Sequence, residues 1–301
     1  MKALVGVDGS DGAWAAVQQT AELLPGKSEI VLYYAPPKLH FSGTHTSQAI
    51  ADKARDSLAK AVFEEALKRI PDGLRSNIST IVGTQGPRRG LLLAAEQVNA
   101  DFVAVGADGL GAARLLLGSV TRALLRHSTR PVLVARPINV RENRAPYRVL
   151  WAVDEPPAVH GPIDFLQKLA WPKGTNGSVI HVVDPLQSME VPAWFTDRVG
   201  HDKEFARRFS EEYDTDKQRR FNEMAAFTSE LPQPFGNLPI LCEGNVANTV
   251  LQMANQEAAD LVIVGTRDLG SVERFFLGST AEAILQFARC SVLVVHMQAK
   301  P

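Results

Sequence analysis

Two stretches of this chain follow one pattern: VGADGLGAARLLLGSVTRALLRHSTRPVLVA at residues 105–135 and VGTRDLGSVERFFLGSTAEAILQFARCSVLVV at residues 264–295. Each reads as an apolar strand, a glycine-containing loop, an amphipathic segment, a Gly-Ser turn, a helix and a second apolar strand. A glycine loop after a strand, followed by Gly-Ser at a helix start, offers backbone N–H groups to an anion. The repeat predicts two domains of one kind, each with a candidate anion site.

The rest of each half also alternates strands with helices. Continuous apolar runs, such as FVAVG at residues 102–106 and LVIVG at residues 261–265, are typical of strands that are covered on both faces. This alternation predicts two tandem, doubly wound α/β domains with parallel sheets. We expect them at residues 1–137 and 146–301, joined by the polar, proline-bounded segment PINVRENRAP at residues 137–146.

The amino-acid composition limits the kinds of partner that we expect the protein to bind. The chain has 301 residues, and 32 Lys+Arg against 33 Asp+Glu give a net charge of -1, without the basic face of a nucleic-acid binder. Two cysteines, Cys242 and Cys290, are too few for a disulfide framework or a cysteine metal site. The first residues enter a strand directly, and no apolar run approaches a membrane span. We expect a cytoplasmic protein without a metal site that binds neither nucleic acid nor membrane.

The glycine cassette is the main candidate for chemistry. Gly106, Gly109 and Gly111 follow a strand end, which is where open α/β sheets place their ligands. Ser119 and Thr121 lie at the start of a helix whose positive end could face a phosphate. The alternative is a glycine-rich turn with a helix cap and no ligand.

Two aspartates, Asp8 and Asp154, end the first strand of each half. A carboxylate at this edge can accept hydrogen bonds from a ribose or a base, and it can equally cap the next helix. For Asp154 the cap is favoured, because Glu155-Pro156-Pro157 follows in place of Gly-Ser. The chain has no G-x-S-x-G elbow, P-loop or G-x-G-x-x-G fingerprint, so no catalytic residue can be named.

The segment VDGS at residues 7–10, the GxxG loop, the Gly-Ser turns and the last strand PVLVA resemble the universal stress protein family. The resemblance covers nearly all of both halves, which implies a tandem-domain member with a five-stranded parallel sheet in the order 3-2-1-4-5 in each. A subset of the family binds ATP through a motif G-x2-G-x9-G-[S/T]. In those members the strand-one aspartate and the backbone after strand two hold adenosine, and the glycine loop and Gly-Ser turn hold the phosphates.

Carried onto this chain, the resemblance implies one set of nucleotide-binding residues in each half. The first-half set is Asp8, Gly9, Ser10, Tyr34, Gly106, Ala107, Asp108, Gly109, Gly118, Ser119, Val120 and Thr121. The weaker second-half set is Asp154, Val182, Gly265, Thr266, Arg267, Asp268, Gly278, Ser279 and Thr280.

Both copies depart from the family motif. Eight residues separate Gly109 from Gly118, one fewer than the motif has. Asp108 would face the phosphates, and a carboxylate about 5 Å from a phosphate costs roughly 3 kcal/mol unless a divalent cation such as Mg²⁺ or Mn²⁺ bridges them. The second copy keeps the nine residues that the motif has before Gly278, and Arg267 stands at the position equivalent to Asp108. Asp268, however, replaces the second glycine of the motif. We expect the first half to retain the nucleotide.

These residues favour a stress-response protein that binds ATP or another adenine nucleotide in the crevice between strands one and four, as a sensor or regulator. The alternatives are a scaffold with degenerate sites and an enzyme of at most slow ATP hydrolysis. The apolar last strands, with Val132, Val134, Val292 and Val294, need covering. We expect the two halves to pair through them, with a homodimer of the whole chain as a further option.

Overall fold

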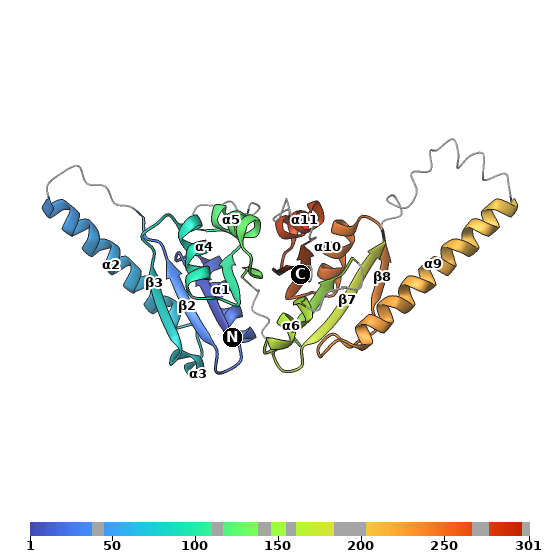
Figure 1. The fold of residues 1–301 in the computed structure, drawn as a ribbon, viewed down its shortest axis with the longest axis horizontal. Helices are drawn as coiled ribbons and strands as arrows, with labels where there is room; N and C mark the ends of the chain where they lie inside the picture. The colour runs from blue at the N-terminus through green and yellow to red at the C-terminus, as the bar shows by residue number, and fades with distance from the viewer. Residues whose placement is uncertain are drawn as a thin grey trace.

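The computed structural model describes residues 1–37, 45–109, 117–137, 146–154, 161–183, 203–266 and 277–296. In both halves strands alternate with helices, as the sequence predicts (Figure 1). The first half contains β1 (Lys2–Gly6), α1 (Asp11–Leu23), β2 (Glu29–Tyr34), α2 (His45–Leu67), α3 (Asp72–Arg75), β3 (Ile78–Val82), α4 (Pro87–Gln97), β4 (Phe102–Gly106), α5 (Ser119–His127) and β5 (Val132–Ala135). The second contains β6 (Arg148–Ala152), α6 (Gly161–Lys168), β7 (Asn176–Val183), α9 (Lys203–Ser229), β8 (Ile240–Glu243), α10 (Val246–Gln256), β9 (Leu261–Thr266), α11 (Ser279–Phe287) and β10 (Ser291–His296).

The strands of each half lie in the order 3-2-1-4-5, and neighbours within a half are parallel. The expected α/β class and strand order are therefore confirmed. The two sheets join through their last strands, at the valines that the sequence singled out: β5 and β10 pair antiparallel, with Val134 opposite Val292 and Val132 opposite Val294. The result is one ten-stranded sheet in which β3 and β8 are the outermost strands (Figure 1).

Helices cover both faces of this sheet, and each face has its own apolar core. One core joins the strands to α1, α2, α6 and α9, and Leu32, Phe102 and Phe235 lie fully buried in it. The other joins them to α4, α5, α10 and α11, with Leu91, Leu124 and Leu285 buried. Since both faces are covered, central strands such as β4 and β9 are apolar runs, whereas the outermost strand β3 is partly exposed. The long helices α2 and α9 lie at the two ends of the sheet and extend outward from it (Figure 1).

Polar contacts reinforce the join between the halves. The backbone N–H of Arg136 donates to Ser291 Oγ at 3.0 Å, while within the first half Gln19 Nε2 holds the Arg136 carbonyl oxygen at 3.0 Å. The Arg136 guanidinium donates to the carbonyl oxygens of Leu285 at 2.5 Å and Cys290 at 3.4 Å. Residues directly after β5 therefore bond to the C-terminal end of α11 and the start of β10.

Candidate functional site

A cavity of about 370 Å³ lies in the first half, at the carboxyl ends of β1, β2 and β4 and beside the start of α5. This is the sheet edge at which open α/β folds bind ligands. Its lining is Gly6, Val7, Asp8, Ser10, Ala13, Tyr33, Ala35, Pro87, Leu91, Val105, Gly106, Asp108, Gly109, Gly118, Ser119, Val120 and Thr121. Most residues of the first-half set thus meet in one hollow, while Gly9, Tyr34 and Ala107 lie outside the lining.

The turn after β1 has a fixed geometry. Asp8 Oδ1 accepts hydrogen bonds from the backbone N–H of Ser10 at 3.0 Å and from Ser10 Oγ at 2.6 Å. Ser10 Oγ in turn accepts the N–H of Ala13 at 3.2 Å, so the helix cap of α1 is Ser10. Asp8 orients this cap with one oxygen, and its Oδ2 lies 2.7 Å from the position of a Cβ on Gly109. That second oxygen therefore lies next to Gly109.

The start of α5 supplies donors to the same cavity. Gly118, the N-cap residue, has φ −58° and ψ 154° and makes no side-chain cap hydrogen bond. The Gly118 N–H donates to the carbonyl oxygen of Ala107 at 2.7 Å, and Thr121 Oγ1 donates to that of Gly106 at 2.8 Å. These bonds hold the helix start against the end of β4. The N–H groups of the first turn have no partner within a helix, so they suit an anion.

The cavity also has apolar residues in its lining. Tyr33, Ala35, Pro87, Leu91 and Val105 line it. The Tyr33 side chain is 4% exposed, and burial raises the pKa of its phenol. Its hydroxyl has no hydrogen-bond partner among the described residues. It lies so close to the backbones of Gly83 and Gly90 that a Cβ on either would overlap it.

The resemblance implies a role for the backbone at Tyr34, whereas the tyrosine that lines the cavity is Tyr33. Neighbouring side chains of a strand point to opposite faces, and Tyr34 packs on the α2 face, edge-on to Phe63 with ring centroids 6.4 Å apart. Burial and the charge of Asp8 raise the pKa of Tyr34. No sequence motif indicated the apolar residues of the lining, which include Tyr33, Pro87 and Leu91. Side chains alternate between the two faces of β2, so Tyr33 could have been identified only by also knowing which face of the sheet α4 covers.

In the second half the expected residues are only partly described. Gly278 caps α11 with φ −57° and ψ 150°, the same conformation as Gly118, and Ser279 and Thr280 follow it in the first turn. Gly265 and Thr266 end β9, Val182 is buried within β7, and Asp154 is exposed at the exit of β6. Arg267 and Asp268 lie outside the described residues, as do residues 138–145 of the expected linker.

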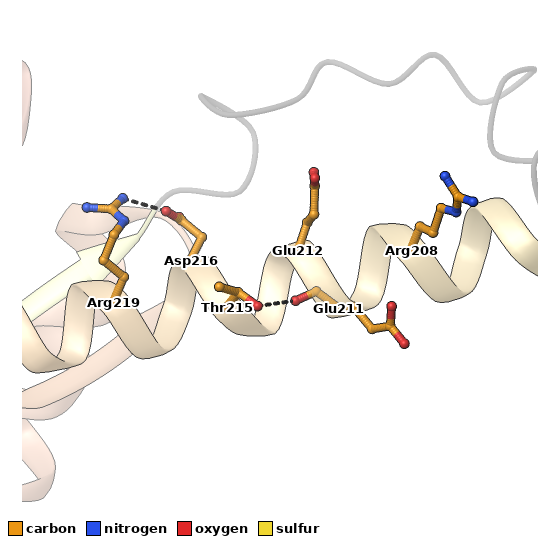
Figure 2. A pocket seen from close by; sticks show the side chains of 6 residues that line it. All are labelled: Arg208, Glu211, Glu212, Thr215, Asp216 and Arg219. Atoms are coloured by element: carbon orange, nitrogen blue, oxygen red, sulfur yellow. Dashed lines mark hydrogen bonds and ion pairs between the residues drawn. The ribbon is translucent and has the colours of Figure 1, made fainter.

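A second hollow, along α9, has different properties. Arg208, Glu211, Glu212, Thr215, Asp216 and Arg219 line it, all from a single helix (Figure 2). Its charges already pair along the helix: Arg208 with Glu204 at 2.8 Å, and Arg219 with Asp216 at 2.5 Å and Glu223 at 2.6 Å. Such exposed i,i+3 and i,i+4 pairs are typical of a solvated helix face, so the first-half cavity is the better candidate.

The described residues also bear on metal binding and on membrane insertion. Among them no cluster of three or more His, Cys, Asp or Glu side chains is placed to hold a metal ion. No helix in the described ranges is both long and apolar enough to cross a membrane.

The fold and the cavity define a doubly wound α/β protein with a crevice at the strand exits. The model of the universal stress protein family matches residues 1–136 and 147–296, so the chain belongs to this family and carries two such domains in tandem. A universal stress protein of Mycolicibacterium smegmatis is 25% identical over 302 residues, which covers 97% of this chain and 96% of that protein. One from Thermus aquaticus is 45% identical over 57 residues, which is only 42% of its length.

Solved structures agree on the fold. A universal stress protein from Archaeoglobus fulgidus covers 98% of this chain with a TM-score of 0.56 and 20% sequence identity, and the match spans 96% of that chain. Single-domain relatives with lower scores include a universal stress protein in complex with cAMP, at a TM-score of 0.34, and one from Arabidopsis thaliana with AMP bound, at 0.30. These ligands belong to those proteins.

Proposed function

We propose that the first-half cavity binds an adenine nucleotide and that the protein acts as a nucleotide-dependent sensor or regulator in a stress response. The observation that carries this proposal is the mixed lining of the cavity, which combines apolar residues with Asp8 and the start of α5. Tyr33, Leu91 and Val105 offer apolar surface for a planar base, and Asp8 and the start of α5 offer polar groups in the same cavity. A nucleotide likewise combines a planar base with a polar ribose and phosphate.

Each part of the nucleotide has a matching group. Asp8 Oδ1 is already used by Ser10, which leaves Oδ2 to accept a hydrogen bond from a ribose hydroxyl. The N–H groups of Ser119, Val120 and Thr121, at the positive end of α5, would receive the phosphate. ATP with Mg²⁺ or Mn²⁺ is one candidate ligand, and a cytoplasmic location is part of the same proposal.

A pair of identical substitutions tests the site. Proline is well tolerated as the first residue of a helix, and Gly118 and Gly278 already have the extended ψ that a following proline requires. Ser119→Pro should therefore keep α5 while removing one N–H from the cavity, and Ser279→Pro makes the same change at α11.

Calorimetric titration with AMP and with Mg-ATP should show binding to the wild type that Ser119→Pro weakens about tenfold or more, as expected for the loss of a charge-assisted hydrogen bond. Ser279→Pro should leave this binding unchanged. The absence of binding to the wild type at millimolar nucleotide would contradict the proposal and favour the scaffold. Equal weakening by both substitutions would contradict the assignment to the first half.

A further inference from the structure

The charge of the cavity is unusual for a site that would receive phosphates. Its described lining contains two carboxylates, Asp8 and Asp108, and no lysine or arginine. The attraction for a phosphate therefore comes from backbone N–H groups, whose combined effect at a helix start is about half a unit charge. The balance between these amides and the two carboxylates decides which nucleotides can bind.

Asp108 lies where it affects the phosphates most. Its Cα is 3.7 Å from the position of a Cβ on Gly118, the residue that caps α5. Its Oδ1 is 3.1 Å from the position of a Cβ on Gly12, in the first turn of α1. The Asp108 carboxylate thus stands beside the first turn of α1, and the Asp108 backbone lies beside the cap of α5.

Within the described part of the chain, no hydrogen bond or ion pair to the Asp108 carboxylate occurs. Burial lowers the pKa of Arg136, and the negative charge of Asp108 acts in the opposite direction, so the two charges attract each other. The Arg136 guanidinium donates its hydrogen bonds to the carbonyl oxygens of Leu285 and Cys290 in the other half. Asp108 therefore lines the cavity with a negative charge that Arg136 offsets only in part.

We propose that Asp108 is a specificity-determining residue that selects nucleotides by the charge of their phosphate tail. This inference rests on the proposed function and names its substrate class: a nucleoside monophosphate is preferred over the free triphosphate, and the triphosphate binds well only as a divalent-cation complex. Each further phosphate charge meets the same carboxylate, so repulsion grows along the series from mono- to triphosphate. A bound cation would remove most of it.

The expected discrimination follows from Coulomb's law. Asp108 is partly exposed, so its interaction with a phosphate charge about 6 Å away is screened toward the value in water. Two additional charges then lower the affinity for metal-free ATP about tenfold relative to AMP. Because screening increases with salt, this difference should shrink as ionic strength rises.

The test uses the whole chain and titrates AMP and ATP in EDTA at low salt. The variants are Asp108→Asn, which keeps the shape of the side chain, and Asp56→Asn, which makes the same change in net charge at an exposed position on α2. Wild type and Asp56→Asn should prefer AMP by about tenfold, and Asp108→Asn should reduce the preference to about twofold or less. Mg²⁺ should improve ATP binding more in the wild type than in Asp108→Asn.

An equal preference in wild type and Asp108→Asn, or no preference in the wild type, would overturn the role of Asp108 while leaving the nucleotide site intact. If no variant binds either nucleotide, both this inference and the proposed function fail. Should Asp108→Asn not fold, the salt series on the wild type decides: an AMP preference that does not shrink as salt rises would overturn the inference.

Discussion

A Cβ on Gly106 would lie 2.6 Å from the carbonyl carbon of Gly12, so β4 and the first turn of α1 meet backbone to backbone. This approach brings the turn after β1, with Asp8 and Ser10, to the glycine loop after β4. Gly106 is therefore needed for close packing at the crevice, and its repeat Gly265 holds the corresponding place at the end of β9.

Gly106→Ala should destabilise the protein by about 2–3 kcal/mol, because the obstructing atoms belong to backbone and cannot rotate away. Gly26→Ala is the control, since Gly26 is exposed and a Cβ there meets nothing within 4 Å. Its free energy of unfolding should stay within about 0.5 kcal/mol of the wild type. Urea denaturation measures both, and equal effects would contradict the close approach.

Gly90 and Tyr33 should be energetically coupled. Alanine usually stabilises a helix relative to glycine, yet Gly90→Ala in α4 should cost about 1–3 kcal/mol, because its Cβ would overlap the Tyr33 hydroxyl. Tyr33→Phe removes that oxygen and leaves the ring carbon Cζ at 3.1 Å. In this background Gly90→Ala should be nearly neutral. A double-mutant cycle that gives no coupling would show that the ring does not occupy this position.

Tyr33→Phe alone should not destabilise the protein. The Tyr33 hydroxyl is buried without a partner among the described residues, so its removal leaves no new unsatisfied group. The unfolding free energy of this variant should be equal to or slightly above that of the wild type. A loss above about 1 kcal/mol would mean that the hydroxyl has a bound partner in solution.

Ser291→Ala tests the join between the halves. Ser291 is fully buried in β10, and its Oγ accepts the Arg136 N–H at 3.0 Å. Without it this N–H loses its partner, which should cost about 1–3 kcal/mol. Ser57→Ala, which removes an exposed hydroxyl from α2, should change stability by less than about 0.5 kcal/mol. Comparable losses would indicate that the Arg136 contact does not stabilise the join.

Cys290 should make the protein less stable at alkaline pH. Burial raises the pKa of its thiol from 9.0 to about 11, although Arg136 acts in the opposite direction. Between these two values the unfolded chain has released a proton that the native chain keeps, so the free energy of unfolding falls as pH rises. In Cys290→Ala the fall between pH 9 and 11 should be smaller by about 1–2 kcal/mol.

Cys242→Ala is the comparison for this measurement. Burial also raises the pKa of the Cys242 thiol, but Cys242 lies in the outermost strand β8 and is less deeply enclosed. This variant should keep most of the alkaline loss seen in the wild type. Parallel pH profiles for the wild type and Cys290→Ala would contradict the burial of the Cys290 thiol.

The sequence predicted the alternation of strands and helices and the helix starts at the two Gly-Ser turns because both depend on local signals, whereas the strand order was implied by the family resemblance. Gly118-Ser119 and Gly278-Ser279 begin helices with the same backbone conformation, and the apolar runs at residues 102–106 and 261–265 are central strands. Asp8 lines the cavity as expected, although the cap of α1 is Ser10.

The remaining features depend on tertiary packing. Tyr33 and Tyr34 are adjacent residues of the same type, so the sequence does not show which of them lines the cavity. The placement of α2 and α4 on opposite faces of the sheet distinguishes them. Pro87 and Leu91 reach the cavity because α4 crosses the sheet beside β2, which no motif encodes. The antiparallel register of Val134 with Val292 likewise arises from two strands far apart in the chain.

The nucleotide content of freshly purified protein tests the central claim most directly. Mass spectrometry of the small molecules released on denaturation, together with calorimetry of the emptied protein, gives identity and stoichiometry. We predict an adenine nucleotide at about one site per chain, lost in Ser119→Pro and kept in Ser279→Pro. No released nucleotide, combined with no binding of AMP or Mg-ATP at millimolar concentration, would contradict the account.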